Sequence, residues 1–436
     1  MFFLRIIETG AIFLLCVALC YGQDSSEIKI TANGRAAMDF GEVIHGYDKS
    51  AGDISHVVID RIYLGTGLTA RLSDRTTCYG NIEVKAFNEF PRQIINGGTR
   101  RYYYYFYLTQ AELTHQFPDF LDVNGLQLNV GGGYFPYKYN ENARNLGEYV
   151  FRSTAYPQTL TTEFEFPFAR LAGLYARSTY SSGINTAKLD LLATINTEWM
   201  AIGDLNLSMI GSYNFARIFE IGAGVEFGSI ISADESATTP VNSATKYQDG
   251  TDTSQYYTFR GTKVMARFSF DPKRVLPPSN IFGDQELILY GEAALLGVKN
   301  YDAALNSPVW YNSRLERIPV MLGFNFPTYK FLDVLSIEGE WWGNRYPNSM
   351  QGIVQDGLPL PFLQGTTSID STAYKNDNLK WSIYGAKTFA NRYRISFQAA
   401  SDHMRTFAWD WNRQDWEEAL RGYKKWYYMI RFGVMF

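Results

Sequence analysis

The residues of this sequence that could act on other molecules are charged side chains set at every second position of apolar segments. Between residues 218 and 229, Glu220 and Glu226 alternate with apolar residues such as Phe219 and Ile221. A period of two puts the charged and the apolar side chains of an extended strand on opposite faces. Charges arranged in this way suit the attraction and sorting of polar solutes and ions along a surface.

Catalytic and metal-binding chemistry has little support in the sequence. His45 and His56 share one stretch with Glu42, Asp48 and Asp53, and these residue types can bind a metal. Their spacing matches no known ligand motif, and two histidines in a loop are more often simply solvated. No Gly-rich phosphate-binding loop followed by a helix occurs. We therefore expect no enzyme activity, no catalytic residue, no metal site and no cofactor.

Aromatic residues offer a second kind of chemistry, which is stacking on sugar rings. The stretch 405–423 contains Trp409, Trp411 and Trp416, and residues 100–108 read RRYYYYFYL. Tryptophan and tyrosine also gather at the interface between a membrane and water. A glycan-binding role and an interfacial role both fit these residues, and the interfacial role is the simpler one.

The direction of the aromatic side chains in residues 100–108 depends on the phase of the strand. If Gln110 and Glu112 face an interior, strict alternation places Tyr102, Tyr104 and Phe106 there as well, as a track for sugars. The tyrosines between them would then join an aromatic girdle on the other face.

The elements that must position these side chains are extended strands. Sixteen segments alternate with a period of two, whereas an amphipathic helix would space its apolar residues three and four apart. The segments lie near residues 28–40, 59–72, 76–89, 100–115, 126–138, 169–180, 187–199, 204–215, 218–231, 256–270, 286–299, 317–327, 331–344, 379–389, 393–404 and 424–436. Their lengths suit membrane-crossing strands of about 9–11 residues with some overhang.

Residues 1–22 are predicted to be a secretory signal peptide. Arg5 gives a positive start, residues 11–19 are apolar, and Cys20 and Gly22 stand at the −3 and −1 positions of a cleavage site. Two of the three cysteines fall in this segment, so Cys78 alone remains and no intramolecular disulfide can form. No later apolar run is long enough for a transmembrane helix.

Composition narrows the fold class. Tyr, Phe and Trp make up 16% of the chain, yet the mean hydropathy is −0.21 and the formal net charge is −4. This charge provides no basic field for nucleic acid. An aromatic-rich, mildly polar and exported chain suits an all-β fold, namely a transmembrane antiparallel up-and-down β-barrel of about 16 strands, with 14–18 acceptable. A soluble β-sandwich is the alternative, but sixteen long strands without a disulfide favour the barrel.

Residues 23–436 are accordingly expected to form a single barrel domain with long loops on one side. With the N-terminus in the periplasm, the connectors on the outer side include 41–58 and four longer loops. These four loops are residues 139–168, 232–255, 345–378 and 405–423. Most connectors on the other side are short, which is the known asymmetry of such barrels. The Pro-rich connector 271–285 is an exception.

The C-terminal strand carries a recognisable pattern. Tyr428, Phe432, Val434 and Phe436 alternate up to the last residue, while Arg431 lies on the other face. This ending resembles the C-terminal signal of bacterial outer-membrane proteins, which the barrel-assembly machinery recognises. The resemblance implies insertion into the outer membrane of a Gram-negative-type bacterium. Gly433 departs from the pattern, which usually places its glycine further from the end.

Closing the barrel would place the last strand beside the first and gather charges of one sign on one wall. The candidate pore-lining cations are Lys29, Arg35, Arg61, Arg71, Arg394, Lys425 and Arg431. The candidate pore-lining carboxylates on the opposite wall are Glu220, Glu226, Glu292, Glu338 and Glu340, interrupted by Lys263 and Arg267. Opposed walls of opposite sign would set up a transverse field that sorts ions, and ordinary solvated charges with paired neighbours are the alternative.

A barrel of this size is too wide for side chains to fill, so an aqueous channel is expected. The architecture resembles that of the general and substrate-specific porins, in which the third outer loop folds inward. Here that loop is 139–168, with Glu141, Glu148, Glu163 and Glu165 as constriction candidates. The resemblance implies passive or weakly selective diffusion of small polar solutes, ions or saccharides through a homotrimer in outer-membrane lipid. The alternative is a loop-plugged barrel that acts in surface glycan or partner binding or adhesion.

Overall fold

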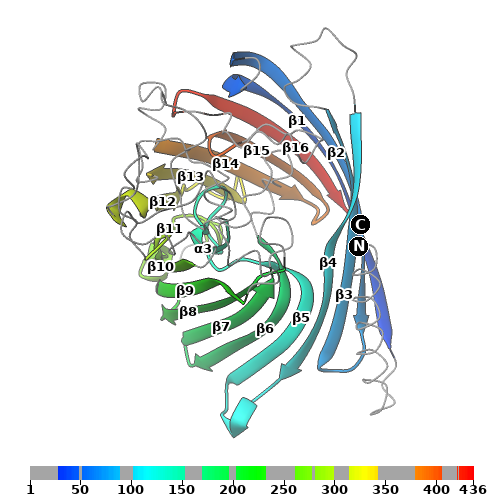
Figure 1. Cartoon of the computed structure of the whole chain (residues 1–436), viewed down its shortest axis with the longest axis vertical. Helices are drawn as coiled ribbons and strands as arrows, with labels where there is room; N and C mark the ends of the chain where they lie inside the picture. The colour runs from blue at the N-terminus through cyan, green and yellow to red at the C-terminus, as the bar shows by residue number, and fades with distance from the viewer. Residues whose placement is uncertain are drawn as a thin grey trace, which may run out of the picture.

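The computed structural model describes residues 28–48, 52–88, 102–152, 169–195, 203–231, 261–276, 280–298, 314–341, 379–404, 420 and 422–436. The strands in this part are β1 (Lys29–Asp48), β2 (Gly52–Arg71), β3 (Thr76–Asn88), β4 (Tyr102–Phe117), β5 (Leu126–Tyr137), β6 (Ala169–Ser182), β7 (Asn185–Ile195), β8 (Leu205–Phe215), β9 (Phe219–Ile231), β10 (Gly261–Phe270), β11 (Leu289–Leu295), β12 (Val320–Asn325), β13 (Val334–Trp341), β14 (Leu379–Phe389), β15 (Tyr393–Ser401) and β16 (Trp426–Met435). The helices are η1 (Phe120–Asp122), α3 (Tyr149–Arg152), η3 (Pro272–Arg274) and η4 (Arg314–Arg317). Figure 1 shows the strands arranged around an interior that contains α3.

The sheet is closed, because each strand pairs antiparallel with its neighbours in sequence and β16 pairs with β1. At this seam the Gly34 amide donates to the Phe436 carbonyl at 2.7 Å, and the Phe436 amide donates back at 2.9 Å. A Cβ atom at Gly34 would collide with the Phe436 ring, so glycine makes room for the terminal aromatic. The predicted antiparallel up-and-down barrel of about sixteen strands is confirmed.

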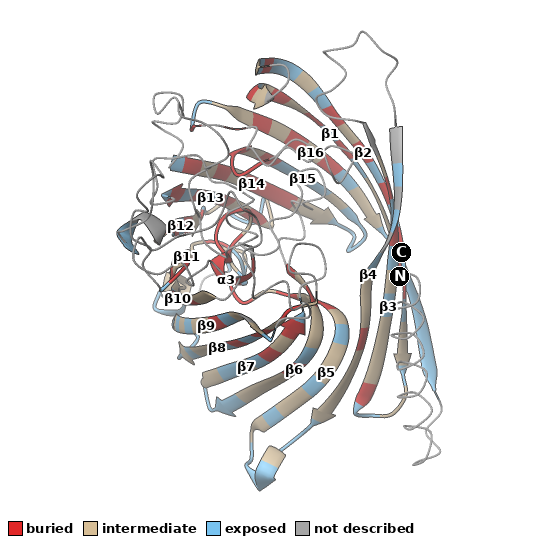
Figure 2. Cartoon of the chain, in the orientation of Figure 1, coloured by how far each residue is buried: buried red, intermediate tan, exposed pale blue. Residues whose placement is uncertain are grey.

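The two faces of the barrel differ as the alternation predicts. On β2, Ile62, Leu64 and Leu68 are 55–56% exposed on the outside, whereas Arg61 and Tyr63 are 2% exposed on the inside. Figure 2 shows this change of burial from residue to residue along the strands. An apolar outer face is what lipid requires, since a charged side chain there costs about 2–4 kcal/mol at mid-membrane.

The first hairpin is longer than the sequence predicts. The expected outer loop 41–58 is strand up to Asp48 and again from Gly52. Val43, Ile54 and Ile59 are 0–4% exposed and belong to one buried apolar cluster with Tyr427 and Met429 of β16. These apolar residues make strand the better state for a stretch whose histidines and acids resemble a loop.

A β-bulge in β4 excludes the aromatic track for sugars that strict alternation would create. Asn81 pairs with Gln110 and Ile82 pairs with Leu108, so one residue of β4 is left out of the register. The phase of β4 reverses at that point. Glu112 faces inward and is buried, whereas Tyr104 and Phe106 are 75% and 69% exposed on the outer face.

The barrel has two different ends. One end carries the first and last strand residues and short turns. These include the three-residue turns 216–218 and 390–392, in which Ala216, Arg217, Ala390 and Asn391 have φ angles between 50° and 59°. We call this end the turn rim. The connector between β10 and β11 also lies at this rim and is long, as predicted, with η3 at its start. No helix in the described ranges has the length and apolar character needed to cross a membrane.

Candidate channel constriction

Strand β5 turns the chain into the barrel with the help of a glycine run. A Cβ atom at Gly131 would collide with the Tyr175 hydroxyl, and Gly133 has a φ of +123°, which L side chains rarely adopt. The space above Gly131 lets Tyr175 of β6 cross towards β4, where its hydroxyl donates to Glu112. After β5 ends at Tyr137, the chain continues inside the barrel.

Residues 138–152, which we call the inward segment, are packed inside the barrel. Tyr139, Leu146, Tyr149 and Phe151 are 1–5% exposed. The short helix α3 at the end of the segment contacts β9, β10 and β11. We call strands β9–β14 the loop-bearing wall, because the polar contacts of the inward segment lie along it.

Glu292 of β11 is the first anchor of the inward segment. Its carboxylate accepts hydrogen bonds from the Tyr139 hydroxyl at 2.5 Å, the Glu148 amide at 3.0 Å and the Tyr149 amide at 2.9 Å. Asn140 Nδ2 adds a fourth bond at 3.0 Å. Burial and the nearby Glu292 raise the pKa of Tyr139 well above its ordinary value. Tyr139 therefore remains a neutral donor to this carboxylate.

Glu338 of β13 is the second anchor. Its carboxylate accepts from three consecutive backbone amides of the inward segment, those of Arg144, Asn145 and Leu146, the last two at 2.8 Å and 2.9 Å. The Tyr290 hydroxyl donates to the same carboxylate at 2.8 Å. Hydrogen bonds to a charged group contribute about 1.5–3 kcal/mol each. Glu338 thus fixes the backbone of the segment and not merely one side chain.

Residues at the base of the last loop hold the middle of the inward segment. Asp402 accepts from Asn145 Nδ2 at 2.8 Å and from the Tyr427 hydroxyl at 2.8 Å. Glu340 accepts from the Tyr149 hydroxyl at 2.8 Å, and His403 Nε2 is paired with its other oxygen. The inward segment is therefore tied to β13 and to the chain that follows β15.

Cations of β10 complete the loop-bearing wall. Lys263 Nζ donates to the Val150 carbonyl at 3.2 Å and pairs with Glu226 at 3.0 Å. Arg267 passes over Gly222, where a Cβ atom would lie 2.8 Å from Arg267 Nε, and pairs with Glu220 at 2.5 Å. Both of these pore-lining carboxylates thus have a cationic partner on the neighbouring strand.

The opposite side of the barrel carries a buried group of cations. Asp39 of β1 stands in register between Arg61 of β2 and Arg431 of β16. Arg431 binds its carboxylate through two nitrogens at 2.5 and 2.9 Å, and Arg61 Nε lies 3.0 Å from it. All three residues are 1–2% exposed. A buried carboxylate shared in this way lowers the cost of burying the two guanidinium groups.

Tyr63 lies at the centre of this group. Lys85 Nζ and Arg431 Cζ are each 4.6 Å from the centre of its ring, which is cation–π distance. Arg35 reaches Glu83 by crossing Gly65, where a Cβ atom would lie 3.2 Å from Arg35 Cγ. We call β16 and β1–β3 the cationic wall, because these strands carry Arg35, Arg61, Lys85 and Arg431.

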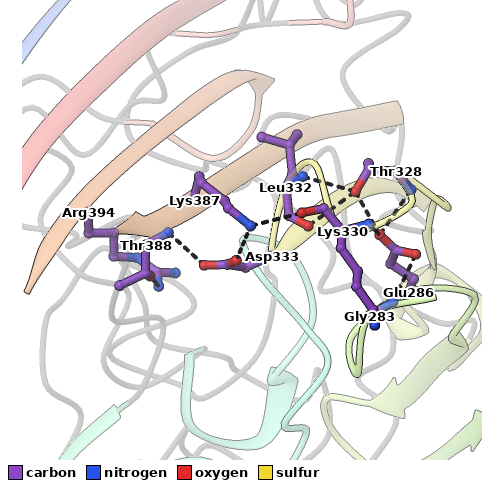
Figure 3. Close-up of polar contacts among 9 residues, drawn as sticks. All are labelled: Gly283, Glu286, Thr328, Lys330, Leu332, Asp333, Lys387, Thr388 and Arg394. Carbon is purple, nitrogen blue, oxygen red and sulfur yellow. Dashed lines mark hydrogen bonds and ion pairs between the residues drawn. The ribbon is translucent and has the colours of Figure 1, made fainter. Parts of the chain in front are cut away.

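A hydrogen-bond network at the turn rim holds the base of the loop-bearing wall (Figure 3). The Glu286 carboxylate accepts from the Gly283, Thr328 and Lys330 amides at 2.8–3.1 Å and from the Thr328 hydroxyl at 2.7 Å. Burial of the Glu286 carboxyl works to raise its pKa, but these donors outweigh burial and hold it below the ordinary value.

Asp333 extends the network to β14. Its carboxylate pairs with Lys387 at 3.0 Å and accepts from the Thr388 amide at 2.6 Å. Burial again works to raise the pKa of Asp333, and these donors lower it below the ordinary value. Arg394 of β15 donates to the Thr388 hydroxyl at 3.1 Å and to the Tyr384 hydroxyl at 3.1 Å.

The remaining predicted pore-lining cations lie near the two ends of the barrel and not at its middle. Lys29 and Arg71 face each other at the turn-rim ends of β1 and β2, and both are exposed there rather than deep in the barrel. Lys425 lies at the other end, where it bonds to Asp53 and to the Gly46 carbonyl. Arg394 lies near the turn rim.

The predicted transverse field between two walls needs correction. The carboxylates of Glu292, Glu338 and Glu340 do not face open lumen, because donors of the inward segment and of the last loop occupy them. Glu220 pairs with Arg267, and Glu226 pairs with Lys263. The acidic wall therefore holds the inward segment instead of opposing the cationic wall across water.

The four predicted constriction residues differ in their surroundings. Glu148 is buried in the inward segment and bonds to the Asn140 amide, whereas Glu141 is exposed. Glu163 and Glu165 lie outside the described residues, as do Trp409, Trp411 and Trp416.

The predicted assembly signal lies on a strand with the expected faces. Tyr428, Phe432, Val434 and Phe436 fall on the outer face of β16 or at its end, with Phe432 49% and Phe436 70% exposed. The structure does not test recognition by the assembly machinery.

Residues with polar roles that the sequence reasoning missed include Asp39, Glu83, Lys85 and Asp402. Asp39 carried a visible signal, since it shares the inward phase of Arg35 on β1. The partners that Asp402, Glu292 and Glu338 have in the inward segment lie more than 140 positions away along the chain. His45 and His56 lie on the first hairpin, where His56 Nδ1 is 2.8 Å from Glu42. In the described ranges, no group of three or more His, Cys, Asp and Glu side chains is arranged to hold a metal ion.

Comparisons with known proteins give distant similarities only. No protein-family model and no curated protein matches the chain. Among solved structures, Salmonella typhi OmpF in complex with daunomycin is similar at 9% identity and a TM-score of 0.47, covering 94% of this chain and 98% of that chain. A mutant of Rh. blastica porin is similar at 9% identity and a TM-score of 0.42, covering 94% of this chain and 100% of that chain. These distant similarities carry no functional argument, and it is the closed sixteen-strand sheet itself that makes this chain a porin-like β-barrel.

Proposed function

We propose that the chain is an outer-membrane, porin-like channel for passive or weakly selective diffusion of small polar solutes, ions or saccharides. A sixteen-strand barrel is too wide for its inward side chains to fill. The observation that carries the proposal is that the inward segment is bound along one wall by Glu292 and Glu338. A segment held on one wall narrows a lumen and leaves the rest of its cross-section for solutes.

The electrostatics of the interior support passage of polar solutes. Arg35 of the cationic wall has a side chain that is 29% exposed, and Glu141 of the inward segment is exposed as well. Charged groups on both sides of a narrowed lumen orient dipolar solutes and sort ions. The proposed pathway runs between the inward segment and the cationic wall.

The location and the partners follow from the same proposal. The apolar outer belt requires lipid, and the exported barrel would reach the outer membrane of a Gram-negative-type bacterium through the barrel-assembly machinery. A homotrimer is part of the proposal by analogy with porins alone.

Single-channel recording tests this function. The purified full chain, folded in detergent and checked by its heat-dependent mobility on a gel, would be added to a planar lipid bilayer. We expect stable, ohmic conductance steps of nanosiemens scale. A folded barrel that gives no steps would contradict the channel and favour the alternative, a plugged barrel that binds surface glycans or partners. Retention on polysaccharide columns would then be measured for the wild type and for Trp409→Ala with Trp411→Ala.

A further inference from the structure

The inward segment takes up most of the carboxylates that line the loop-bearing wall. Glu292, Glu338 and Glu340 are 1–3% exposed. The acceptor oxygens of Glu292 and Glu338 are each shared by four protein donors. A solute in transit therefore meets neither the surface of these carboxylates nor a free lone pair on them.

Strands β6 and β7 carry two cations, Arg177 and Lys188, that do not bind the inward segment. Lys188 of β7 has the inward phase of Leu192 and Thr194, which are 2% and 4% exposed, while Leu189 and Leu191 face outward. Lys188 itself is exposed. In the described part of the chain its side chain makes no hydrogen bond or ion pair, although it interacts electrostatically with the carboxylates of Asp190 and Glu220. Its ammonium group is thus free to meet a solute in the lumen.

Arg177 of β6 is the diagonal neighbour of Lys188. It stands in register with Asp190, and Lys188 stands in register with Thr179, two residues further along β6. Diagonal neighbours on one face of adjacent strands lie about 7–8 Å apart. The Arg177 guanidinium carbon is 4.0 Å from the centre of the Tyr175 ring and 5.2 Å from that of Tyr137. These aromatic contacts hold the guanidinium group in place.

The carboxylate nearest to this pair is already partly engaged. Asp190 accepts a hydrogen bond from the Tyr137 hydroxyl at 2.7 Å. Within the inward segment as described, Glu141 is the exposed carboxylate, and Arg144 of the same segment is partly exposed. Lys188 therefore places an exposed positive charge in the described interior, in addition to the exposed Glu141 of the inward segment.

Distance decides which charges matter to a solute. Two unit charges 4 Å apart in water interact with about 1 kcal/mol, and salt screens charges beyond about 8–10 Å. An exposed ammonium group can approach a solute to contact distance. A carboxylate behind a layer of protein donors cannot.

We infer that Lys188 and Arg177 form a binding station for small solutes that carry a carboxylate or phosphate group, and that the channel prefers anions. The inference rests on the proposed channel function. It assigns to β6 and β7 a selectivity role that is separate from the cationic wall. It also predicts a sign of selectivity opposite to that expected from the acidic composition.

The test is the reversal potential of wild-type channels in a potassium chloride gradient across a planar bilayer. We expect a potential of the sign that marks chloride as more permeant than potassium. Lys188→Glu should lower the chloride-to-potassium permeability ratio several-fold, and Lys188→Gln should lower it by less. Arg217→Glu is the matched control, since it makes the same charge change at an exposed turn-rim position. It should leave the ratio near the wild-type value.

A second readout measures binding directly. Inorganic phosphate and citrate, added in turn to one side, should reduce the chloride current of the wild type and have a several-fold weaker effect on Lys188→Glu. Cation preference in the wild type, or equal ratios for wild type and Lys188→Glu, would overturn the inference while leaving the channel in place. An absence of conductance from folded wild-type barrel would instead overturn the proposed function.

Discussion

The two carboxylates that anchor the inward segment on the loop-bearing wall and the buried carboxylate of the cationic wall are satisfied in different ways. On the loop-bearing wall, Glu292 and Glu338 are surrounded by backbone amides and tyrosine hydroxyls. On the cationic wall, Asp39 is surrounded by the guanidinium groups of Arg61 and Arg431. Neutral donors satisfy the first set, and opposite charges satisfy the second.

This difference separates two tasks of a barrel interior. Carboxylates bound by backbone amides can position a segment that enters from another part of the chain, because every residue except proline offers an amide. Carboxylates bound by arginines fix neighbouring strands to each other, as Asp39 does across the β1–β16 seam. The loop-bearing wall therefore sets the shape of the lumen, and the cationic wall stabilises the closure of the sheet.

The largest effect is expected from loss of Asp39. Asp39→Ala removes the carboxylate that lies between two buried guanidinium groups, and breaking such a group costs about 3–5 kcal/mol. The midpoint of thermal unfolding, followed by the loss of the compact gel band, should fall further than for Glu338→Gln or Glu286→Gln. Glu141→Ala, which removes an exposed carboxylate, is the control. Equal midpoints for Asp39→Ala and Glu141→Ala would mean that the seam does not depend on Asp39.

A smaller loss of stability but a larger change in conductance is expected from Glu338. Glu338→Gln keeps the shape of the side chain but loses its charge and one acceptor, so three amides of the inward segment compete for fewer lone pairs. An unsatisfied buried donor costs about 1–3 kcal/mol. The segment should detach intermittently, which single-channel recording would show as noise and as substates of higher conductance.

A larger change in conductance for Glu338→Gln than for Asp39→Asn would support the different roles of the two walls. Folded channels of both variants would be compared in the same salt. Steady wild-type steps from Glu338→Gln would show that the inward segment is held without this anchor.

Alternation predicted the fold because lipid imposes it on every strand. Outward positions such as Ile62 and Leu64 have to be apolar, and this requirement leaves polar residues such as Arg61 to the interior. Strand ends were harder to predict, since the extended hairpin of β1 and β2 leaves the region where lipid selects the residues. The bulge in β4 had no signal, because one unpaired residue reverses the phase without changing the composition.

The site could be predicted in position but not in role. Glu292 and Glu338 face inward as their phase implies, yet five of their eight partners are backbone amides between residues 144 and 149. Any sequence supplies backbone amides, so nothing in the residues of the inward segment marks it as their partner. The pairing of Asp39 with cations was easier to predict, since Asp39 shares the inward phase of Arg35 on the same strand.

The smallest effect on stability is expected from the hydrogen-bond network at the turn rim. This network supports the base of the loop-bearing wall and does not close the sheet. The pKa of Glu286 is lowered in the folded barrel relative to its ordinary value of 4.5. Because the folded state binds the proton less tightly than the unfolded state, the stabilisation is complete above pH 4.5 and is lost as the pH falls through the lowered value. The same sign holds for the pKa of Asp333, whose ordinary value is 3.8.

Thermal unfolding of the wild type and of Glu286→Gln as a function of pH checks this expectation. The midpoint difference between the two proteins should be largest at neutral pH and should shrink as the pH falls below 4.5, because protonation then removes in the wild type what the substitution has already removed. Asp333→Asn should show the same trend with a smaller amplitude, since the Asp333 side chain is 37% exposed and its ion pair with Lys387 is screened by water. A difference that grows on acidification would mean that Glu286 is protonated more readily in the folded barrel. In that case its amide donors would not hold the charge, and the support of the loop-bearing wall would have to come from the strands themselves.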